Sequence, residues 1–220
     1  MKIDAIVLLS GGLDSTVNLY AANSKWEDGV LALTFNYGQK AFVKEREAAL
    51  YFCNDLSVPL KVIDLSPIFA FDKSALTTDL KSIPTDAVNI ESLEISKETA
   101  KNVWVSNRNG VLLNVAACVA ESMGAKFIVP GFNKEEAATF PDNSVEYIST
   151  INESFRYSTS NQVEVFCFTQ DLDKIEIMKK AFELKVPTDK IWPCYYAGET
   201  RCGHCESCKR FDRALKGVRV

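Results

Sequence analysis

The sequence predicts an α/β protein with a mostly parallel sheet flanked by helices and a short metal-binding segment near its carboxyl end. Short apolar runs recur along the chain, and longer segments with helical spacing separate them, an alternation typical of parallel sheets. Four cysteines lie within 15 residues near the end. Because 220 residues can bury one good core, we expect one α/β domain, residues 1–190, with a cysteine segment, residues 191–220, packed on it.

The periodic pattern predicts five strands and five helices, in alternation. The apolar runs that predict strands are Ile3–Leu9, Val30–Phe35, Leu60–Leu65, Lys126–Pro130 and Val163–Phe168. The stretches that predict helices are Ser15–Ser24, Phe42–Asn54, Gly110–Met123, Ser144–Tyr157 and Lys174–Leu184. In an open sheet of this kind, ligands bind beyond the carboxyl ends of the strands, so we expect the site there.

One long segment, Ser66 to Asn107, departs from this alternation. It is mostly polar and shows no sustained apolar face, so we expect a loop. A loop of this length is uncommon in a compact domain and is usually functional or mobile. We therefore expect it to cover the site; the alternative is a disordered excursion without a catalytic role.

The first apolar run leads directly into the SGGLDS loop, residues 10–15. Two adjacent glycines remove every Cβ from the turn, so a ligand can contact main-chain N–H groups. The next stretch is helical, and a helix N-terminus attracts anions because its first amides lack internal partners. The loop predicts a phosphate site, and the alternative is a plain strand-turn-helix corner. We expect valine at Gly11 or Gly12 to abolish turnover and leave the fold largely intact.

The cysteine cluster predicts a structural zinc site. Its members are Cys194, Cys202, Cys205 and Cys208. Four thiolates complete the tetrahedral coordination of Zn²⁺ and leave no position for water, so we expect the metal to hold the segment without touching the reaction. A [4Fe–4S] cluster and free thiols remain as alternatives. His204 is expected to face solvent, and Cys53, Cys118 and Cys167 are expected to be small core residues.

The composition excludes several classes of protein. The net charge is −4 and no dense run of Lys and Arg is present, so a nucleic-acid partner is not expected. No apolar run approaches the roughly 20 residues of a membrane span, and no export leader is visible. We expect a cytoplasmic protein without a membrane partner.

The SGGLDS loop resembles the SGGxDS pattern of the PP-loop ATP pyrophosphatases, in which it holds the β- and γ-phosphates of ATP. It is not a Walker loop, because no GK[ST] follows. The resemblance implies cleavage between the α- and β-phosphates, which leaves an adenylylated substrate and pyrophosphate. The residues that this resemblance assigns to ATP are Ser10, Gly11, Gly12, Leu13, Asp14, Ser15 and Thr16.

Together with this loop, the run WPCYYAGETRCGHCESCKR, residues 192–210, resembles the 7-cyano-7-deazaguanine synthase family over essentially the whole chain. The family motif LTFDYGQ appears as LTFNYGQ, with Asn36 in place of aspartate. The motif VPGRN appears as VSNRN, in which Arg108 and Asn109 are kept but Ser106 and Asn107 replace Pro-Gly.

Two further motifs extend the resemblance. The segment VPGFNKEEAATFPDNS keeps Gly131, Pro141 and Asp142 and has Phe140 where the family has tyrosine. The motif LDKAE appears as LDKIE and contains Lys174.

The resemblance implies an ATP-dependent ligase of queuosine or archaeosine precursor synthesis. Such an enzyme converts 7-carboxy-7-deazaguanine and ammonia to the nitrile through an adenylylated carboxylate and an amide. It implies Mg²⁺ bridging the ATP phosphates, with Asp14 in its shell. The expected catalytic residues are Asp14, Arg108 and Lys174, and the expected substrate-binding residues are Arg108, Asn109, Phe140 and Asp142.

Each of these residues also has an alternative role without chemistry. Arg108 could form a surface ion pair, and Phe140 could belong to the core. Asp142 could cap the following helix, and Lys174 could be an ordinary lysine of a first helical turn.

Other functions remain open beside this one. A paralogous PP-loop ligase could transfer a similar activated carboxylate to another acceptor or stop at the amide, and the altered residues 105–110 and 135–144 lie where specificity is set. A tRNA-thiolating PP-loop enzyme could use the cysteines for sulfur or a cluster. A non-enzymatic zinc-ribbon module would leave SGGLDS unexplained. The family resemblance implies a homodimer, and free ammonia is the default nitrogen source.

Overall fold

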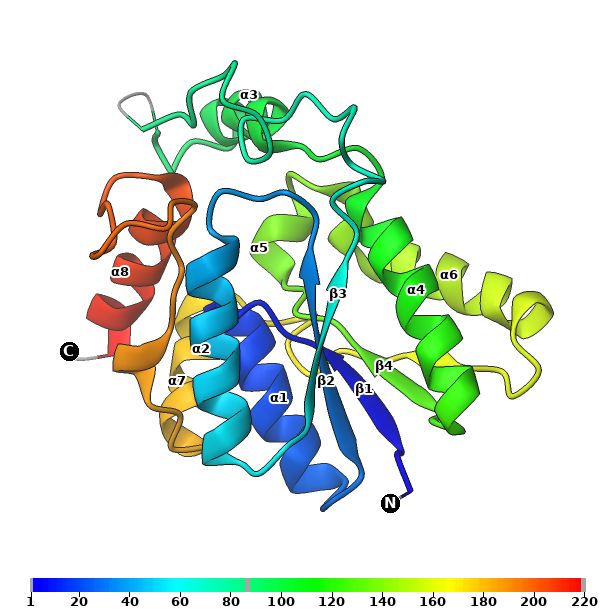
Figure 1. The fold of residues 1–220 in the computed structure, drawn as a ribbon. Coiled ribbons are helices and arrows are strands. Elements are labelled where there is room, and N and C mark those ends of the chain that lie inside the picture. Colours follow the sequence, from blue (N-terminus) through cyan, green and yellow to red (C-terminus); the bar gives the residue numbers. More distant parts are fainter. Residues whose placement is uncertain (1, 86–87, 219–220) are drawn as a thin grey trace.

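The computed structural model describes residues 2–85 and 88–218 and contains a five-stranded, wholly parallel sheet (Figure 1). The strand order is β3-β2-β1-β4-β5. The strands are β1 Ala5–Leu8, β2 Val30–Asn36, β3 Leu60–Asp64, β4 Phe127–Val129 and β5 Glu164–Val165. The central strand pairs with both neighbours, so that Ile6 lies opposite Leu31 and Ile128. The predicted α/β class with a mostly parallel sheet is confirmed.

Helices cover both faces of the sheet (Figure 1). On one face lie α1 Leu13–Lys25, α2 Phe42–Asp55, α7 Lys174–Glu183 and α8 Glu206–Val218. On the other lie α4 Arg108–Met123 and α6 Val145–Ser158. Successive side chains of a strand point to opposite faces of the sheet, so the sheet has one apolar core on each face. Ala5 and Val7 of β1 pack with the first group of helices, and Ile6 packs with the second.

The observed elements differ from the predicted ones by a few residues at most boundaries, and three differences change the description of the fold. Helix α1 begins at Leu13 rather than Ser15, because extended Gly12 serves as its N-cap. Strand β5 is only two residues long, although the backbone N–H of Phe166 still donates to the Ile128 carbonyl oxygen at 2.8 Å. Helix α8 was not predicted, although it buries an apolar face with Phe211 and Ala214 behind the cysteines.

The segment expected to be a loop contains helix α3, Leu93–Val103. Ser92 caps it by accepting a hydrogen bond from the backbone N–H of Ile95 at 3.4 Å. The buried face of α3 consists of Ser96, Thr99, Ala100 and Val103. Because half of these residues are polar, the segment shows no sustained apolar face that would predict a helix. Figure 1 shows α3 beyond the carboxyl ends of the strands, where a cover was expected.

The three isolated cysteines differ in burial. Cys53 is buried as predicted and Cys167 is partly buried. The prediction for Cys118 is wrong, because this thiol is exposed on α4, whose buried face carries Leu113, Ala116, Ala117 and Ala120. No helix in the described ranges is long and apolar enough to cross a bilayer.

Candidate active site

A cavity of about 260 Å³ lies beyond the carboxyl ends of the strands. Its walls come from the SGGLDS loop, the end of β2, the starts of α2 and α4, the segment after β4, the start of α7, and the cysteine segment. The predicted site residues in these walls are Ser10, Gly12, Leu13, Asp14, Ser15, Arg108, Asn109, Phe140 and Lys174. Gly11, Thr16 and Asp142 do not line the cavity.

The SGGLDS loop is held open by its own hydroxyl groups. Ser15 Oγ accepts from the backbone N–H of Ser10 at 3.2 Å and lies 3.0 Å from Ser10 Oγ. Ser10 Oγ accepts from the backbone N–H of Gly12 at 3.3 Å. These contacts fix the loop at the N-terminus of α1, where free amides favour an anion.

The two glycines of the loop serve different purposes, which corrects the expectation that both substitutions leave the fold intact. Gly11 has φ +75°, and a Cβ there would lie 2.6 Å from Ala48 Cβ and 3.0 Å from the Glu45 carbonyl oxygen. Gly12 has φ −75°, and its Cβ would meet only Ser10 Oγ at 3.4 Å. Gly11 therefore lets α2 pack against the loop, and Gly12 leaves the cavity side open.

This difference predicts opposite results for a matched pair of variants. Gly12→Val should fold with an unchanged melting temperature and lose at least about tenfold in ATP affinity, because its methyl groups occupy the space where phosphate oxygens approach. Gly11→Val should lose more than about 1 kcal/mol of stability, because it combines a strained φ with overlap against α2. Thermal melts with and without ATP check both. Equal destabilisation of the two variants would contradict this assignment.

A buried group of three charged residues lies beside the loop. Lys174 Nζ is 2.5 Å from Asp14 Oδ2 and 2.7 Å from Glu136 Oε1. Asn133 Nδ2 donates to Asp14 Oδ2 at 3.1 Å. Lys174 stands in the first turn of α7, but it is buried and directed into the site rather than exposed.

The pKa values of the two carboxylates in this group are shifted in opposite directions. Burial raises the pKa of Asp14 to about 6, although Lys174 opposes the shift. Burial also acts against ionisation of Glu136, but the Lys174 ammonium, together with Arg210 and Asn133, outweighs it and holds the pKa of Glu136 below its usual range. Glu136 therefore stays ionised to a lower pH than Asp14 does.

Asp14 also has an oxygen free to bind a metal ion. Its Oδ1 is buried and has no hydrogen-bond partner among the described residues. A carboxylate oxygen is a ligand that Mg²⁺ prefers, and this one lies at the helix terminus where phosphates are expected. Asp14 therefore fits the shell of a magnesium ion bound with ATP.

The Asp14 pKa predicts a pH dependence. Because the pKa is raised to about 6, the carboxylate is ionised above that pH and becomes protonated as the pH falls through it. A protonated oxygen does not bind Mg²⁺, so the affinity for Mg-ATP should be level from pH 7 to 8 and fall about tenfold for each pH unit below about 5.5. Calorimetry, with the titration of ATP itself subtracted, checks this. An affinity that stays level down to pH 4.5 would contradict it.

Arg108 and its neighbours form the opposite wall. Arg108 Nη1 donates to Tyr37 Oη at 3.3 Å, and its Nε donates to Asn109 Oδ1 at 3.4 Å. In the part of the chain that is described, no carboxylate lies within 4.0 Å of this guanidinium. Arg108 is thus not in a surface ion pair; it is a cation in a cavity wall, and carboxylates such as Asp142 act on it only from beyond ion-pair distance.

The altered motif before Arg108 has a structural explanation. Asn107 adopts φ +51°, a left-handed conformation that glycine and asparagine tolerate better than other residues. Asn107 is the N-cap of α4, so this conformation makes the turn that places Arg108 at the start of the helix.

The predicted ring-binding residues separate into two groups. Asn109 and Phe140 line the cavity. Phe140 also packs against the core and stacks on Trp104, with the two ring centroids 6.1 Å apart. Asp142 lies behind the wall in a short 3-10 helix, η1 Pro141–Asn143, where its carbonyl accepts from Asn109 Nδ2 at 3.4 Å. Asp142 does not cap α6, because Ser144 does so.

Several residues of the cavity wall were not predicted from the sequence: Tyr37, Gln39, Glu45, Glu136, Tyr195, Glu206 and Arg210. Tyr37 and Gln39 belong to the LTFNYGQ stretch, which offered a local signal. The acidic residues gave no such signal, because similar glutamates occur on solvent-exposed helix faces throughout the chain.

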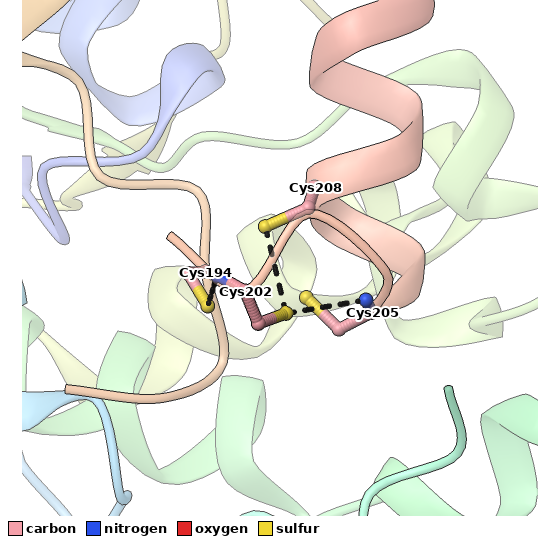
Figure 2. A group of neighbouring side chains, drawn as sticks. All are labelled: Cys194, Cys202, Cys205 and Cys208. Carbon is pink, nitrogen blue, oxygen red and sulfur yellow. Dashed lines mark hydrogen bonds between the residues drawn. The ribbon is translucent and has the colours of Figure 1, made fainter. Parts of the chain in front are cut away.

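The four cysteines form one compact cluster (Figure 2). Their sulfur atoms all lie within 4.8 Å of one another, and the group does not include His204, which is exposed. Cys202 Sγ lies 4.0 Å from Cys208 Sγ, and backbone N–H groups of Cys202 and Cys205 point at cluster sulfurs (Figure 2). Four convergent thiols make a metal site.

The cysteine segment also contributes to the cavity. Tyr195 and Arg210 lie in its wall, so residues of the segment border the site even though the metal itself is expected only to hold the segment in place. Arg210 is buried; it pairs with Glu206 at 2.7 Å and with Glu135 at 2.8 Å. Its Nη2 also donates to Ser96 Oγ of α3 at 3.4 Å. One guanidinium thus joins α8, the covering helix α3 and the segment after β4.

Comparison with known proteins gives consistent matches over the whole chain. The family model described as "Queuosine biosynthesis protein QueC" matches residues 4–219. The 7-cyano-7-deazaguanine synthase of Bdellovibrio bacteriovorus is 50% identical over 216 residues, 98% of this chain and 94% of the relative. That of Carboxydothermus hydrogenoformans is 48% identical over 213 residues, 97% of this chain and 98% of the relative.

A solved structure with a similar fold is the U34-tRNA thiolase NcsA from Methanococcus maripaludis with its [4Fe-4S] cluster. The TM-score is 0.51 at 16% identity, over 99% of this chain and 71% of that one. At this identity the likeness concerns the fold alone.

Proposed function

Because the chain belongs to the QueC family of queuosine biosynthesis proteins, we propose that it converts 7-carboxy-7-deazaguanine and ammonia to 7-cyano-7-deazaguanine with ATP. The observation that supports this most is the pairing in one cavity of a phosphate-binding helix terminus with an unpaired guanidinium. The first suits ATP and the second suits an acceptor that carries a carboxylate.

The reaction proceeds in two activations. A carboxylate oxygen of the acceptor attacks the α-phosphate of ATP, the bond between the α- and β-phosphates breaks, and pyrophosphate leaves. Ammonia then attacks the acyl carbon, AMP leaves, and a proton is lost, which gives the amide. The amide oxygen then attacks the α-phosphate of a second ATP and pyrophosphate leaves; loss of AMP, which carries that oxygen away, and of both protons of the amide nitrogen gives the nitrile.

The chain's residues mainly position and neutralise charge in this scheme. The SGGLDS loop and Lys174 hold the phosphates that leave as pyrophosphate. Arg108 orients the acceptor carboxylate, and Asn109 and Phe140 contact its ring. Asp142 supports Asn109 through its carbonyl oxygen, Gly11 permits the packing of α2, and the fully buried Thr16 donates its backbone N–H to the Gly12 carbonyl oxygen at 3.1 Å. A magnesium ion, when bound, neutralises phosphate charge.

The cysteine cluster fits a structural zinc ion. Thiolates about 2.3 Å from one zinc ion lie about 3.8 Å from one another, which agrees with sulfur atoms within 4.8 Å. A cubane cluster binds its four thiolates on four separate iron atoms, so it needs them further apart. With four protein ligands, zinc offers no position for substrate, and its role is to fold residues 191–218.

The remaining parts of the proposal come from the sequence. They are a domain limit near residue 190, free ammonia as the nitrogen source, a homodimer, a cytoplasmic location, and no nucleic-acid partner.

The decisive experiment incubates the purified chain with 7-carboxy-7-deazaguanine, ammonium and Mg-ATP. We expect the nitrile, identified by mass, with two AMP and two pyrophosphate per nitrile. Release of ADP and orthophosphate would exclude the PP-loop chemistry. Accumulation of the amide alone, or a conjugate only when another amine is supplied, would favour the paralogous ligase.

Arg108→Ala should lower kcat/KM for the carboxylate substrate by about 10- to 150-fold, or about 1.5–3 kcal/mol, because a charge-assisted pair is lost. Steady-state kinetics check this, with Arg156→Ala as control. Arg156 is exposed on α6, pairs with Glu153 at 3.1 Å and does not line the cavity. Unchanged kinetics for Arg108→Ala would remove this residue from the site.

A further inference from the structure

The carboxylate of Glu45 is held in a fixed orientation at the cavity. Gln39 Oε1 accepts from the backbone N–H of Tyr37 at 2.8 Å, which fixes the amide so that its Nε2 faces inward. That Nε2 donates to the Phe35 carbonyl at 2.9 Å and to Glu45 Oε2 at 2.8 Å. The turn after β2 therefore positions this one carboxylate oxygen.

The other oxygen of Glu45 has no such partner. Within residues 2–85 and 88–218, Oε1 accepts no hydrogen bond, and no cation lies within 4.0 Å of the carboxylate. Glu45 lines the cavity. Its burial raises its pKa to about 6, so at neutral pH the group is an anion that only accepts hydrogen bonds.

Arg108 lines the same cavity and also lacks an ion-pair partner. The guanidinium is near enough to act on the Glu45 pKa, but the two groups do not form a salt bridge. A buried carboxylate and a buried guanidinium that do not contact one another each retain a desolvation cost, and a ligand that binds both groups relieves it. The matching ligand presents an anion to Arg108 and hydrogen-bond donors to Glu45.

We propose that Glu45 determines acceptor specificity by receiving two hydrogen bonds from the guanine-like edge of the substrate, from the ring N1–H and the exocyclic 2-amino group. This inference rests on the proposed function for the identity of the acceptor. Two adjacent donors match a carboxylate in a bidentate pair. At the same two positions adenine presents the acceptor N1 and a C2–H, so it does not fit.

The test compares two acceptors, 7-carboxy-7-deazaguanine and the analogue without its 2-amino group, 7-carboxy-7-deazahypoxanthine. Equilibrium binding of both is measured by calorimetry, together with kcat/KM and the KM for ATP, in wild type, Glu45→Gln and Glu47→Gln. Glu47 is exposed on the same helix and pairs with Lys44 at 2.7 Å, which makes it a matched control.

We expect wild type and Glu47→Gln to bind the 2-amino compound at least about 30-fold more tightly than the analogue. A site built to bond a donor rejects a ligand that lacks it. In Glu45→Gln the ratio should fall to within about threefold, with the KM for ATP unchanged, because the amide presents an N–H to the ligand's own donors.

Three results would overturn the inference. Wild type could bind both acceptors equally or bind neither. Glu45→Gln could weaken both acceptors by the same factor, which would indicate a structural role. It could also raise the KM for ATP and keep the ratio, which would place the carboxylate on the ribose hydroxyls. Because binding needs no turnover, a retained 30-fold preference without nitrile formation would reject the proposed function and leave the assignment of Glu45 in place.

Discussion

Lys174→Met is expected to abolish turnover and to lower the free energy of unfolding by about 3–5 kcal/mol at pH 7.5. The substitution leaves the carboxylates of Asp14 and Glu136 buried without their cation, and breaking a buried pair from one side costs far more than the pair itself contributes. It also removes the positive charge that faces the ATP phosphates. Urea denaturation and pyrophosphate release measure the two effects.

The loss of stability should depend on pH in a defined direction. The Asp14 pKa is already raised in the folded protein, and removal of Lys174 raises it further. Protonation of Asp14 in the folded variant therefore begins above pH 6, so the deficit should be largest at high pH and should shrink as the pH falls toward 6. Lys179→Met, on the exposed side of α7, is the control. A stable, active Lys174→Met variant would show that this lysine is an ordinary first-turn residue.

Cys205→Ser is expected to have the second large effect. Cys205 is fully buried, and the binding energy of a structural zinc ion, about 10 kcal/mol or more in small peptides, becomes folding free energy. The variant should lose its metal, melt at a much lower temperature and be poorly soluble. Activity should fall with the folded fraction of the cysteine segment, because Tyr195 and Arg210 belong to the cavity wall.

Metal content by mass spectrometry and turnover per folded molecule check this result. Cys118→Ser, an exposed thiol outside the cluster, should retain metal, stability and activity. A soluble and fully folded Cys205→Ser variant without zinc and without activity would place the metal in the chemistry. Iron in the wild-type protein would overturn the zinc assignment.

Local sequence was sufficient for the parts of the protein that depend on neighbouring residues. The SGGLDS loop and the four cysteines are short in sequence, and each is compact in space as well. The apolar runs Ile3–Leu9 and Val30–Phe35 contain β1 and most of β2 because central strands of a parallel sheet are buried on both faces. Helix α3 was not predicted because its buried face is partly polar.

The rest of the site depends on long-range packing that no local pattern reveals. Lys174 meets Asp14 across 160 positions, and Arg210 meets Glu135 across 75. Glu45 resembles any glutamate in the first turn of a surface helix until the turn after β2 places Gln39 beside it. Such residues become functional candidates only when the fold shows which charges are buried without a partner.

The guanidinium of Arg210 joins the helix behind the cysteine cluster to the cover and to the segment after β4. Because ligands and metal then stabilise the same folded arrangement, their affinities are reciprocal by thermodynamic linkage. If bound metal raises the affinity for the acceptor by some factor, a bound acceptor must raise the affinity for the metal by the same factor. An enzyme saturated with substrates therefore retains its metal against a chelator better than the resting enzyme does, and metal supply sets the fraction of molecules competent to bind substrate.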